Sequence, residues 1–368
     1  MSTRKDKFSK KDILYMNLAL KLASARHGLT GTNPSVGCVI VKNDKIISIG
    51  QTGYGGRPHA EYNAINNSIE NVEGAKMYVT LEPCNHYGLT PPCTTKIINN
   101  KISEVLYSIE DVDNKVKGKS FKIFKSKKII IKKGLLKRDM KIFYFPYFFN
   151  RTKKLPYVTG KIAISKNNLI YSKTNRKITN LNSDKFTHFL RYKNDSLMIS
   201  YKTLNKDNPR LNCRLKGFEK FSPKRIILDN KLNSNIKSYI IKTSNNNNTL
   251  IFYNKADRLK VLNLKRRGIK LIKSKINKNN EFDMKIVLKK LYNLGCRNLL
   301  IEGGGIFTNF LIKKKIFNKF YLFRGTKNLS KFSEYLKFNS LNILNKNYKK
   351  KINLNLNLNK DKITLYKY

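Results

Sequence analysis

Tryptophan is absent from this chain of 368 residues, which also has only five cysteines and four histidines. The cysteines are Cys38, Cys84, Cys93, Cys213 and Cys296. Because they are odd in number and widely spaced, they argue against a disulfide framework and indicate a reducing, cytoplasmic compartment, where thiols bind metals or react. We expect no signal peptide, since residues 1–12 are polar and charged. The best candidate for a membrane segment, 142–149, is too short and contains Pro146.

Acidic residues are also few: 23 Asp and Glu stand against 76 Lys and Arg, which gives a net charge of +53. Such an excess suits nucleic-acid binding, because basic side chains that neutralise phosphates release counterions. Asparagine and isoleucine are enriched together with lysine, however, as in the asparagine run 245–248. Neither has an electrostatic purpose. We therefore interpret the charge as compositional bias together with a preference for phosphorylated substrates, and keep nucleic-acid binding as the alternative.

The length suits two domains, and a hydrophobic fraction of 40% is enough for packed cores. We predict strands at 36–41, 46–49, 75–81, 104–109, 157–165, 196–200, 225–228, 249–253, 298–301, 319–323 and 362–366. We predict helices at 11–25, 60–69, 94–99, 184–191, 283–294 and 307–313. This alternation indicates the α/β class, with a boundary near residue 150 and domains at 1–150 and 151–368.

Three metal-binding side chains form an ordered array in the first domain. His59 precedes Ala60-Glu61, Cys84 follows Pro83, and Cys93 follows Pro92. One imidazole and two thiolates suit zinc and leave one position for a water, whose pKa falls to about 7 on the metal. Glu61 is placed to shuttle a proton from that water to a leaving amine, as in zinc deaminases. The alternatives are buried cysteines beside an unrelated histidine, or a structural zinc site, which normally has four protein ligands.

The residues around this array resemble those of a known enzyme family. Eight residues separate Cys84 from Cys93, and the chain carries Asn-Pro-Ser-Val-Gly at 33–37, Thr-Leu-Glu-Pro-Cys at 80–84, His-Tyr-Gly at 86–88 and Thr-Pro-Pro-Cys at 90–93. Together they resemble the bifunctional deaminase/reductase family of riboflavin biosynthesis. The resemblance is specific over residues 12–118 and continues more faintly to the end.

The resemblance implies a cytidine-deaminase-like three-layer domain followed by a dihydrofolate-reductase-like domain. It implies hydrolytic loss of the 2-amino group of 2,5-diamino-6-(5-phosphoribosylamino)pyrimidin-4-one, and then reduction of the ribosyl group to ribityl. The implied cofactors are one Zn²⁺ per chain and NADPH. In the first pocket, Asn33, His86 and Asp111 would contact the substrate.

The second domain contains two sequence patterns that are less specific than the metal-binding array. Glu302-Gly303-Gly304-Gly305 stands between a predicted strand and a predicted helix, where backbone amides can approach a phosphate, although a simple tight turn is equally compatible. Residues 203–214 match a further segment of the family. The resemblance places Arg191, Asp207, Leu211, Arg214 and Glu302 at the substrate. It places Lys161, Ala163, Lys177, Thr203, Gly304, Gly305, Ile306 and Phe307 at NADPH. A guanidinium suits phosphate because its planar fork bonds two oxygens, but Arg191 and Arg214 could also be solvated surface cations.

Several positions depart from the family. Leu89 stands where the family usually has Lys or Arg, Thr52 where it often has His, and Lys177 where it has Trp. Lys166-Asn167-Asn168 also departs from the pattern of the family. These changes bear more on the efficiency of the reductase than on the activity of the deaminase. We expect a phosphoribosylamino-pyrimidine as partner, a homo-oligomer, and neither membrane nor nucleic acid. The alternatives are a nucleic-acid-directed (tRNA-type) zinc deaminase, a deaminase whose reductase half has decayed, and a scaffold that keeps only the zinc fold.

Overall fold

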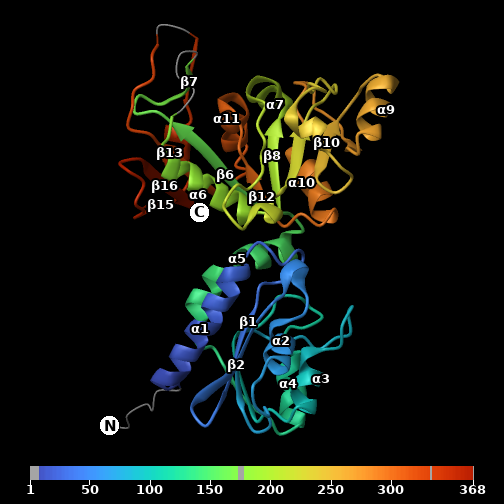
Figure 1. Ribbon diagram of the computed structural model, residues 1–368, viewed down its shortest axis with the longest axis vertical. Helices are drawn as coiled ribbons and strands as arrows, with labels where there is room; N and C mark the ends of the chain where they lie inside the picture. Colours follow the sequence, from blue (N-terminus) through green and yellow to red (C-terminus); the bar gives the residue numbers. More distant parts are fainter. Residues whose placement is uncertain (1–7, 173–177, 332–333, 368) are drawn as a thin grey trace. The chain divides into compact units, whose positions relative to one another are not determined.

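The structure is a computed structural model that describes residues 8–172, 178–331 and 334–367. Lys177, predicted at NADPH, lies outside these ranges. The chain divides into two compact units, residues 1–154 and 155–368 (Figure 1). The α/β class predicted from the sequence is confirmed, since each unit is built on a sheet with helices. Within the described ranges, no helix combines the length and the apolar composition that crossing a membrane requires.

The first unit has one central sheet. Its elements are α1 (Lys10–Arg26), β1 (Gly37–Lys42), β2 (Lys45–Gln51), the 3-10 turn η1 (Tyr54–Gly56), α2 (Ala60–Asn66), β3 (Lys76–Leu81), α3 (Cys93–Asn99), β4 (Glu104–Ile109), α4 (Lys119–Ser126), β5 (Ile130–Lys133) and α5 (Lys137–Lys153). The strand order is β2-β1-β3-β4-β5, antiparallel as far as β3 and parallel from β3 to β5. Helices α1 and α5 cover one face, and α2, α3 and α4 cover the other (Figure 1). This is a three-layer arrangement.

Local sequence explains how these layers begin. Ser9 and Asp12 form a capping box that starts α1, since each side chain accepts a hydrogen bond from the other's backbone amide. Gly37 lets α1 lie directly on β1, because a Cβ at this position would overlap the carbonyl oxygen of Ala19. The predicted helix 60–69 ends earlier, at Asn66. The stretch 114–155, to which the sequence assigned no element, contains α4, β5 and α5.

The second unit is larger. Its elements are β6 (Tyr157–Ile164), β7 (Leu169–Ser172), α6 (Leu181–Tyr192), β8 (Ser196–Ser200), α7 (Tyr201–Asp207), the 3-10 turn η2 (Glu219–Phe221), β9 (Lys224–Leu228), α8 (Tyr239–Lys242), β10 (Thr249–Tyr253), α9 (Arg258–Arg266), β11 (Lys270–Lys273), α10 (Met284–Asn293), β12 (Asn298–Ile301), α11 (Gly305–Lys313), β13 (Lys319–Arg324), β14 (Tyr335–Lys337), α12 (Leu341–Asn347), β15 (Lys350–Asn353) and β16 (Lys362–Lys367).

Nine of its strands form one sheet in the order β11-β10-β9-β8-β12-β6-β13-β16-β15, parallel from β11 to β13 and antiparallel beyond. Buried side chains of α10, α11 and α12 join the core on one face, and those of α6, α7, α8 and α9 join the core on the other. Because β8 and β12 are parallel neighbours, their carboxyl ends meet. The segments that follow them, α7 and the turn at 302–304, therefore lie together.

Candidate active sites

The three predicted metal ligands converge in the first unit. His59 is the N-cap residue of α2, Cys84 lies in the loop after β3, and Cys93 is the first residue of α3. The His59 Nδ1 atom lies 3.3 Å from the Cys93 sulfur and 3.5 Å from the Cys84 sulfur. All three ligand atoms lie within 4.8 Å of one another. The backbone amide of Cys93 donates to the Cys84 sulfur at 3.3 Å, so the start of α3 fixes both thiols.

The electrostatics of this cluster favour a metal. A hydrogen bond from the Cys93 thiol lowers the pKa of Cys84 to about 4, and the same bond raises the pKa of Cys93. The bond to Cys84 also raises the pKa of His59. Zinc would let both thiols act as thiolates, because a bound cation favours the deprotonated form of each sulfur. One nitrogen and two sulfur donors, with space left for a fourth ligand, fit a zinc ion.

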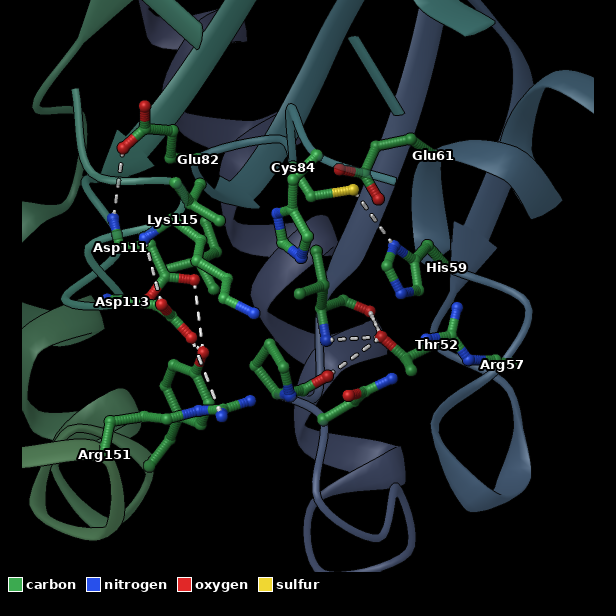
Figure 2. Close-up of a pocket in the computed structure, with 17 residues that line it drawn as sticks. Thr52, Arg57, His59, Glu61, Glu82, Cys84, Asp111, Asp113, Lys115 and Arg151 are labelled. Carbon is green, nitrogen blue, oxygen red and sulfur yellow. Dashed lines mark hydrogen bonds and ion pairs between the residues drawn. The ribbon is translucent and has the colours of Figure 1, made fainter. Parts of the chain in front are cut away.

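Glu61 lies beside the cluster without belonging to it. It stands in the first turn of α2, is 4% exposed, and is separated from His59 by Ala60 alone. Burial raises its pKa to about 6, with a further contribution from the charge of Cys84. Figure 2 shows the Glu61 carboxyl group next to Cys84 and His59, facing the same space. A buried carboxyl group in this position can hold or release a proton close to neutral pH.

A cavity of about 200 Å³ opens in front of this cluster (Figure 2). Its lining includes His59, Glu61 and Cys84 together with the three predicted substrate residues Asn33, His86 and Asp111. The structure thus brings together six predicted residues that come from four separate segments. Leu89 is 88% exposed and does not line the cavity.

The aromatic segment of α5, which the sequence analysis did not connect with a site, supports this cavity. The Tyr144 hydroxyl donates to the backbone oxygen of Ser35 at 3.0 Å and lies 2.6 Å from the Thr80 hydroxyl oxygen. Tyr144 is 2% exposed. The Thr52 hydroxyl accepts a hydrogen bond from the Val36 amide at 2.9 Å. These contacts fix the 33–36 loop. The run of aromatic residues at 142–149 could have indicated a buried helix. The residues that it contacts, Ser35 and Thr80, are far away in the sequence, so the contact itself could not be predicted.

The two carboxyl groups on the acidic side of the cavity, Glu82 and Asp111, accept hydrogen bonds from other groups of the protein. Glu82 accepts hydrogen bonds from the backbone amides of Asp111, Gly118 and Ser120. Asp111 accepts from the Tyr147 hydroxyl at 3.2 Å, and burial raises the pKa of Asp111. The loop from 111 to 118 is therefore clamped at both of its ends by Glu82.

In the second unit, the predicted residues Arg191 and Glu302 are bonded to each other. Arg191 Nε and Nη2 each lie 2.8 Å from a carboxylate oxygen of Glu302. Arg191 Nη1 donates to the backbone oxygen of Asn212 at 3.1 Å. A second cavity is lined by Arg191, Pro209, Arg210 and Arg214, so Arg191 and Arg214 do converge. Three guanidinium groups around one cavity suit an anion.

His188 is a member of this region that the sequence analysis missed. It is 8% exposed, and its Nδ1 accepts a hydrogen bond from the Arg214 backbone amide at 3.2 Å. Burial, together with the charges of Arg191 and Arg214, lowers its pKa to about 4. Leu211 was predicted at the substrate, but its side chain is 3% exposed and packs in the core. Asp207 is exposed at the end of α7.

The remaining predicted residues surround the turn between β12 and α11. The Gly304 amide donates to the Thr203 hydroxyl at 3.3 Å, which joins this turn to α7. Helix α11 begins at Gly305, so Ile306 and Phe307 stand in its first turn, and Ile306 is 70% exposed. Lys161 and Ala163 lie on β6, and burial lowers the pKa of Lys161.

Both units match families of known proteins. Residues 9–109 match the cytidine and deoxycytidylate deaminase zinc-binding region, and residues 156–333 match the RibD C-terminal domain. The riboflavin biosynthesis protein RibD of Aquifex aeolicus is 33% identical over 315 residues, which are 85% of this chain and 86% of the relative. The chain belongs to the RibD family. The RibD of Buchnera aphidicola is 31% identical over 356 residues, 89% of this chain and 90% of the relative.

Solved RibD structures share the architecture. One form of Acinetobacter baumannii RibD superposes with a TM-score of 0.83 at 25% identity, covering 97% of this chain and 98% of that one. The diaminohydroxyphosphoribosylaminopyrimidine deaminase/5-amino-6-(5-phosphoribosylamino)uracil reductase of Thermotoga maritima gives 0.78 at 28% identity with the same coverage. As a RibD family member the chain is a deaminase/reductase enzyme of riboflavin biosynthesis, with zinc and NADPH as cofactors. The predicted family, fold and cofactors are confirmed, and a nucleic-acid-directed deaminase is not favoured.

Proposed function

We propose that residues 1–154 deaminate 2,5-diamino-6-(5-phosphoribosylamino)pyrimidin-4-one and that residues 155–368 reduce the ribosyl group of the product with NADPH. The single observation that carries this proposal is the convergence of His59, Cys84 and Cys93 beside buried Glu61 in a cavity. Membership of the RibD family supports the order of the two reactions. The substrate is a small phosphorylated molecule, and the basic chain suits its charge.

In the deaminase, His59, Cys84 and Cys93 would hold the zinc ion. When bound there, zinc supplies a Lewis acid that makes water nucleophilic near neutral pH. Glu61 takes a proton at its carboxylate and passes it to the amine that leaves the ring. Asn33 and His86 bind the pyrimidine, and the 33–36 loop keeps Asn33 in place because Tyr144 and Thr52 hold its backbone.

In the reductase, NADPH supplies the hydride. We place the cofactor at the turn joined to α7 by Thr203 and Gly304, where the start of α11 leaves backbone amides for its phosphates. Lys161, Ala163, Ile306 and Phe307 would line the same region. Arg214 would bind the substrate phosphate, while Arg191 and Glu302 keep each other in place. Asp207 and the backbone of Leu211 would complete the substrate site.

We also propose that the enzyme works in the cytoplasm as a homo-oligomer and without nucleic acid. The five cysteines are free thiols, and two of them are needed as thiolates, which suits a reducing compartment. Sedimentation of the purified chain, with and without added RNA, measures the last two points.

The proposal is tested by incubating the enzyme with the diaminopyrimidine phosphate, with and without NADPH, and weighing the products by mass spectrometry. Without NADPH we expect only the deaminated ribosyl product. With NADPH we expect the ribityl product, which is heavier by two hydrogens. Accumulation of the ribosyl product in both cases would mean that the reductase half has decayed, and an unchanged substrate would contradict the deaminase.

A further inference from the structure

The cavity of the first unit has two chemically different sides. His59 and Glu61 lie on one side, and Asp113, Lys115 and Arg151 lie on the opposite side (Figure 2). The side with His59 is where an amine would be removed. In a phosphoribosylamino-pyrimidine the phosphate stands at the far end of the ribosyl chain from the ring amines. The opposite side is therefore the place where the anionic end of such a substrate must lie.

Arg57, Lys115 and Arg151 line the cavity, and they differ in whether a carboxylate is paired with them. Arg151 is paired with Asp113 at 3.6 Å. Arg57 is on the same side as His59 in Figure 2, and its guanidinium donates to the Thr90 hydroxyl at 2.6 Å. Across the described residues, no carboxylate lies within ion-pair distance of Arg57 or Lys115. On the side of the cavity opposite His59, Arg151 is paired with a carboxylate and Lys115, within the described ranges, is not.

The backbone that carries Lys115 is held firmly. The Lys115 amide donates to Asp113 Oδ1 at 3.1 Å, and the Asp113 amide donates to Asp111 Oδ1 at 2.9 Å. Val116 is 4% exposed and anchors the following position in the core. The side chain itself is exposed and, in Figure 2, extends toward the middle of the cavity. Only the flexible stem of the lysine must be ordered when an anion binds.

The loop between Cys84 and Cys93 brings no cation of its own. Its sequence from 85 to 92 contains neither Lys nor Arg, and Leu89 at its tip is 88% exposed. The anionic end of a substrate must therefore find its counter-charge elsewhere in the lining.

We propose that Lys115 binds the phosphate of the substrate in the deaminase cavity and so sets the preference of this half of the enzyme for phosphorylated pyrimidines. This inference rests on the proposed deaminase function and names the residue that selects its substrate class. An ammonium group acts on a phosphate as a point charge and does not require a fixed geometry. The interaction is formed in the ground state and in the transition state alike, so its loss raises KM and leaves kcat.

The test compares two substrates, the diaminopyrimidine phosphate and its dephosphorylated nucleoside, by ammonia release without NADPH. For Lys115→Gln we expect a KM about tenfold higher for the phosphorylated substrate, with kcat within about twofold. The nucleoside should be deaminated as by the parent enzyme. Lys115→Arg should restore most of the affinity. Lys117→Gln is the matched control, since this exposed lysine lies on the same loop but does not line the cavity.

An unchanged KM in Lys115→Gln, or an equal loss on both substrates, would overturn the inference. Calorimetry with ribose 5-phosphate separates this outcome from failure of the deaminase proposal. It is carried out on the full chain in an Arg214→Gln background, which weakens the second cavity. Lys115→Gln should weaken the remaining binding about tenfold, and Lys117→Gln should not. If the parent released no ammonia, the deaminase proposal would fail, while this titration would still decide whether Lys115 binds the phosphate.

Discussion

Arg191 and Glu302 form a bidentate ion pair, with two nitrogen–oxygen distances of 2.8 Å, at the point where α6 faces the end of β12. Their side chains are 11% and 12% exposed. Although burial alone would raise the pKa of Glu302, the guanidinium of Arg191 holds that pKa below its ordinary value. The guanidinium of Arg191 is therefore already bonded to Glu302. Arg214 is exposed and is better placed to bind an anionic ligand.

Replacement of Arg191 by alanine leaves the Glu302 carboxylate buried without its partner. We expect the free energy of unfolding of the second unit to fall by about 3–5 kcal/mol. Urea unfolding followed by circular dichroism measures this change. Arg214→Ala is the matched control, with an expected change within about 0.5 kcal/mol, because Arg214 is exposed. Equal effects of the two replacements would show that the ion pair does not hold this region together.

Tyr144→Phe removes the hydroxyl that joins α5 to the 33–36 loop. The backbone oxygen of Ser35 would then be buried without its donor, which costs about 1–3 kcal/mol. Because this loop carries Asn33, we also expect a higher KM for deamination. Tyr62→Phe, at an exposed tyrosine, should change neither quantity. Thermal unfolding and ammonia release measure both, and a stable, fully active Tyr144→Phe enzyme would contradict the role given to α5.

His188 gives the second unit a dependence on pH. Its pKa in the folded chain, about 4, lies below the ordinary value of 6.5. The unfolded chain therefore binds a proton that the folded chain does not, and this contribution to stability is complete above pH 6.5 and is lost as the pH falls toward 4. We expect a loss on the order of 2–3 kcal/mol across this window. His188→Gln should flatten the slope, and an NMR titration of His188 with a midpoint near 6.5 would contradict the expectation.

Removal of zinc should unfold or loosen the first unit, since metal binding is coupled to folding. Cys84→Ala should purify with less than about one tenth of the zinc of the parent chain, because two ligands hold the metal poorly. Cys296→Ala, in the second unit, should retain about one zinc per chain. Elemental analysis by mass spectrometry measures the content. Full zinc occupancy in Cys84→Ala would show that the ligand set is wrong.

The metal cluster could be predicted from the sequence because each ligand sits in a short local motif. His59 and Glu61 belong to one helix start, and the prolines before Cys84 and Cys93 mark the ends of neighbouring elements. Strands β4, β8, β10 and β12 were predicted with their observed bounds, since a run of buried β-branched and aliphatic side chains is itself a local signal.

Helix α5 could not be predicted in the same way. Pro146 lies inside it, where proline removes a hydrogen bond and ordinarily costs about 3 kcal/mol. Burial of Met140 and Tyr144 against the sheet offsets this cost, but such packing is visible only in three dimensions. The roles of Lys115 and His188 could not be predicted for a related reason. Neither residue stands in a motif, and each lies beside residues that are distant in the sequence.

We propose that Glu61 moves the proton in a zinc-dependent deamination. The most direct measurement is ammonia release by Glu61→Gln, with the zinc content determined on the same sample. We predict about one zinc per chain, as in the parent, and a rate lowered at least about a hundredfold, since proton transfer contributes 10²–10⁴-fold. A zinc-loaded Glu61→Gln enzyme that releases ammonia as fast as the parent would contradict the account.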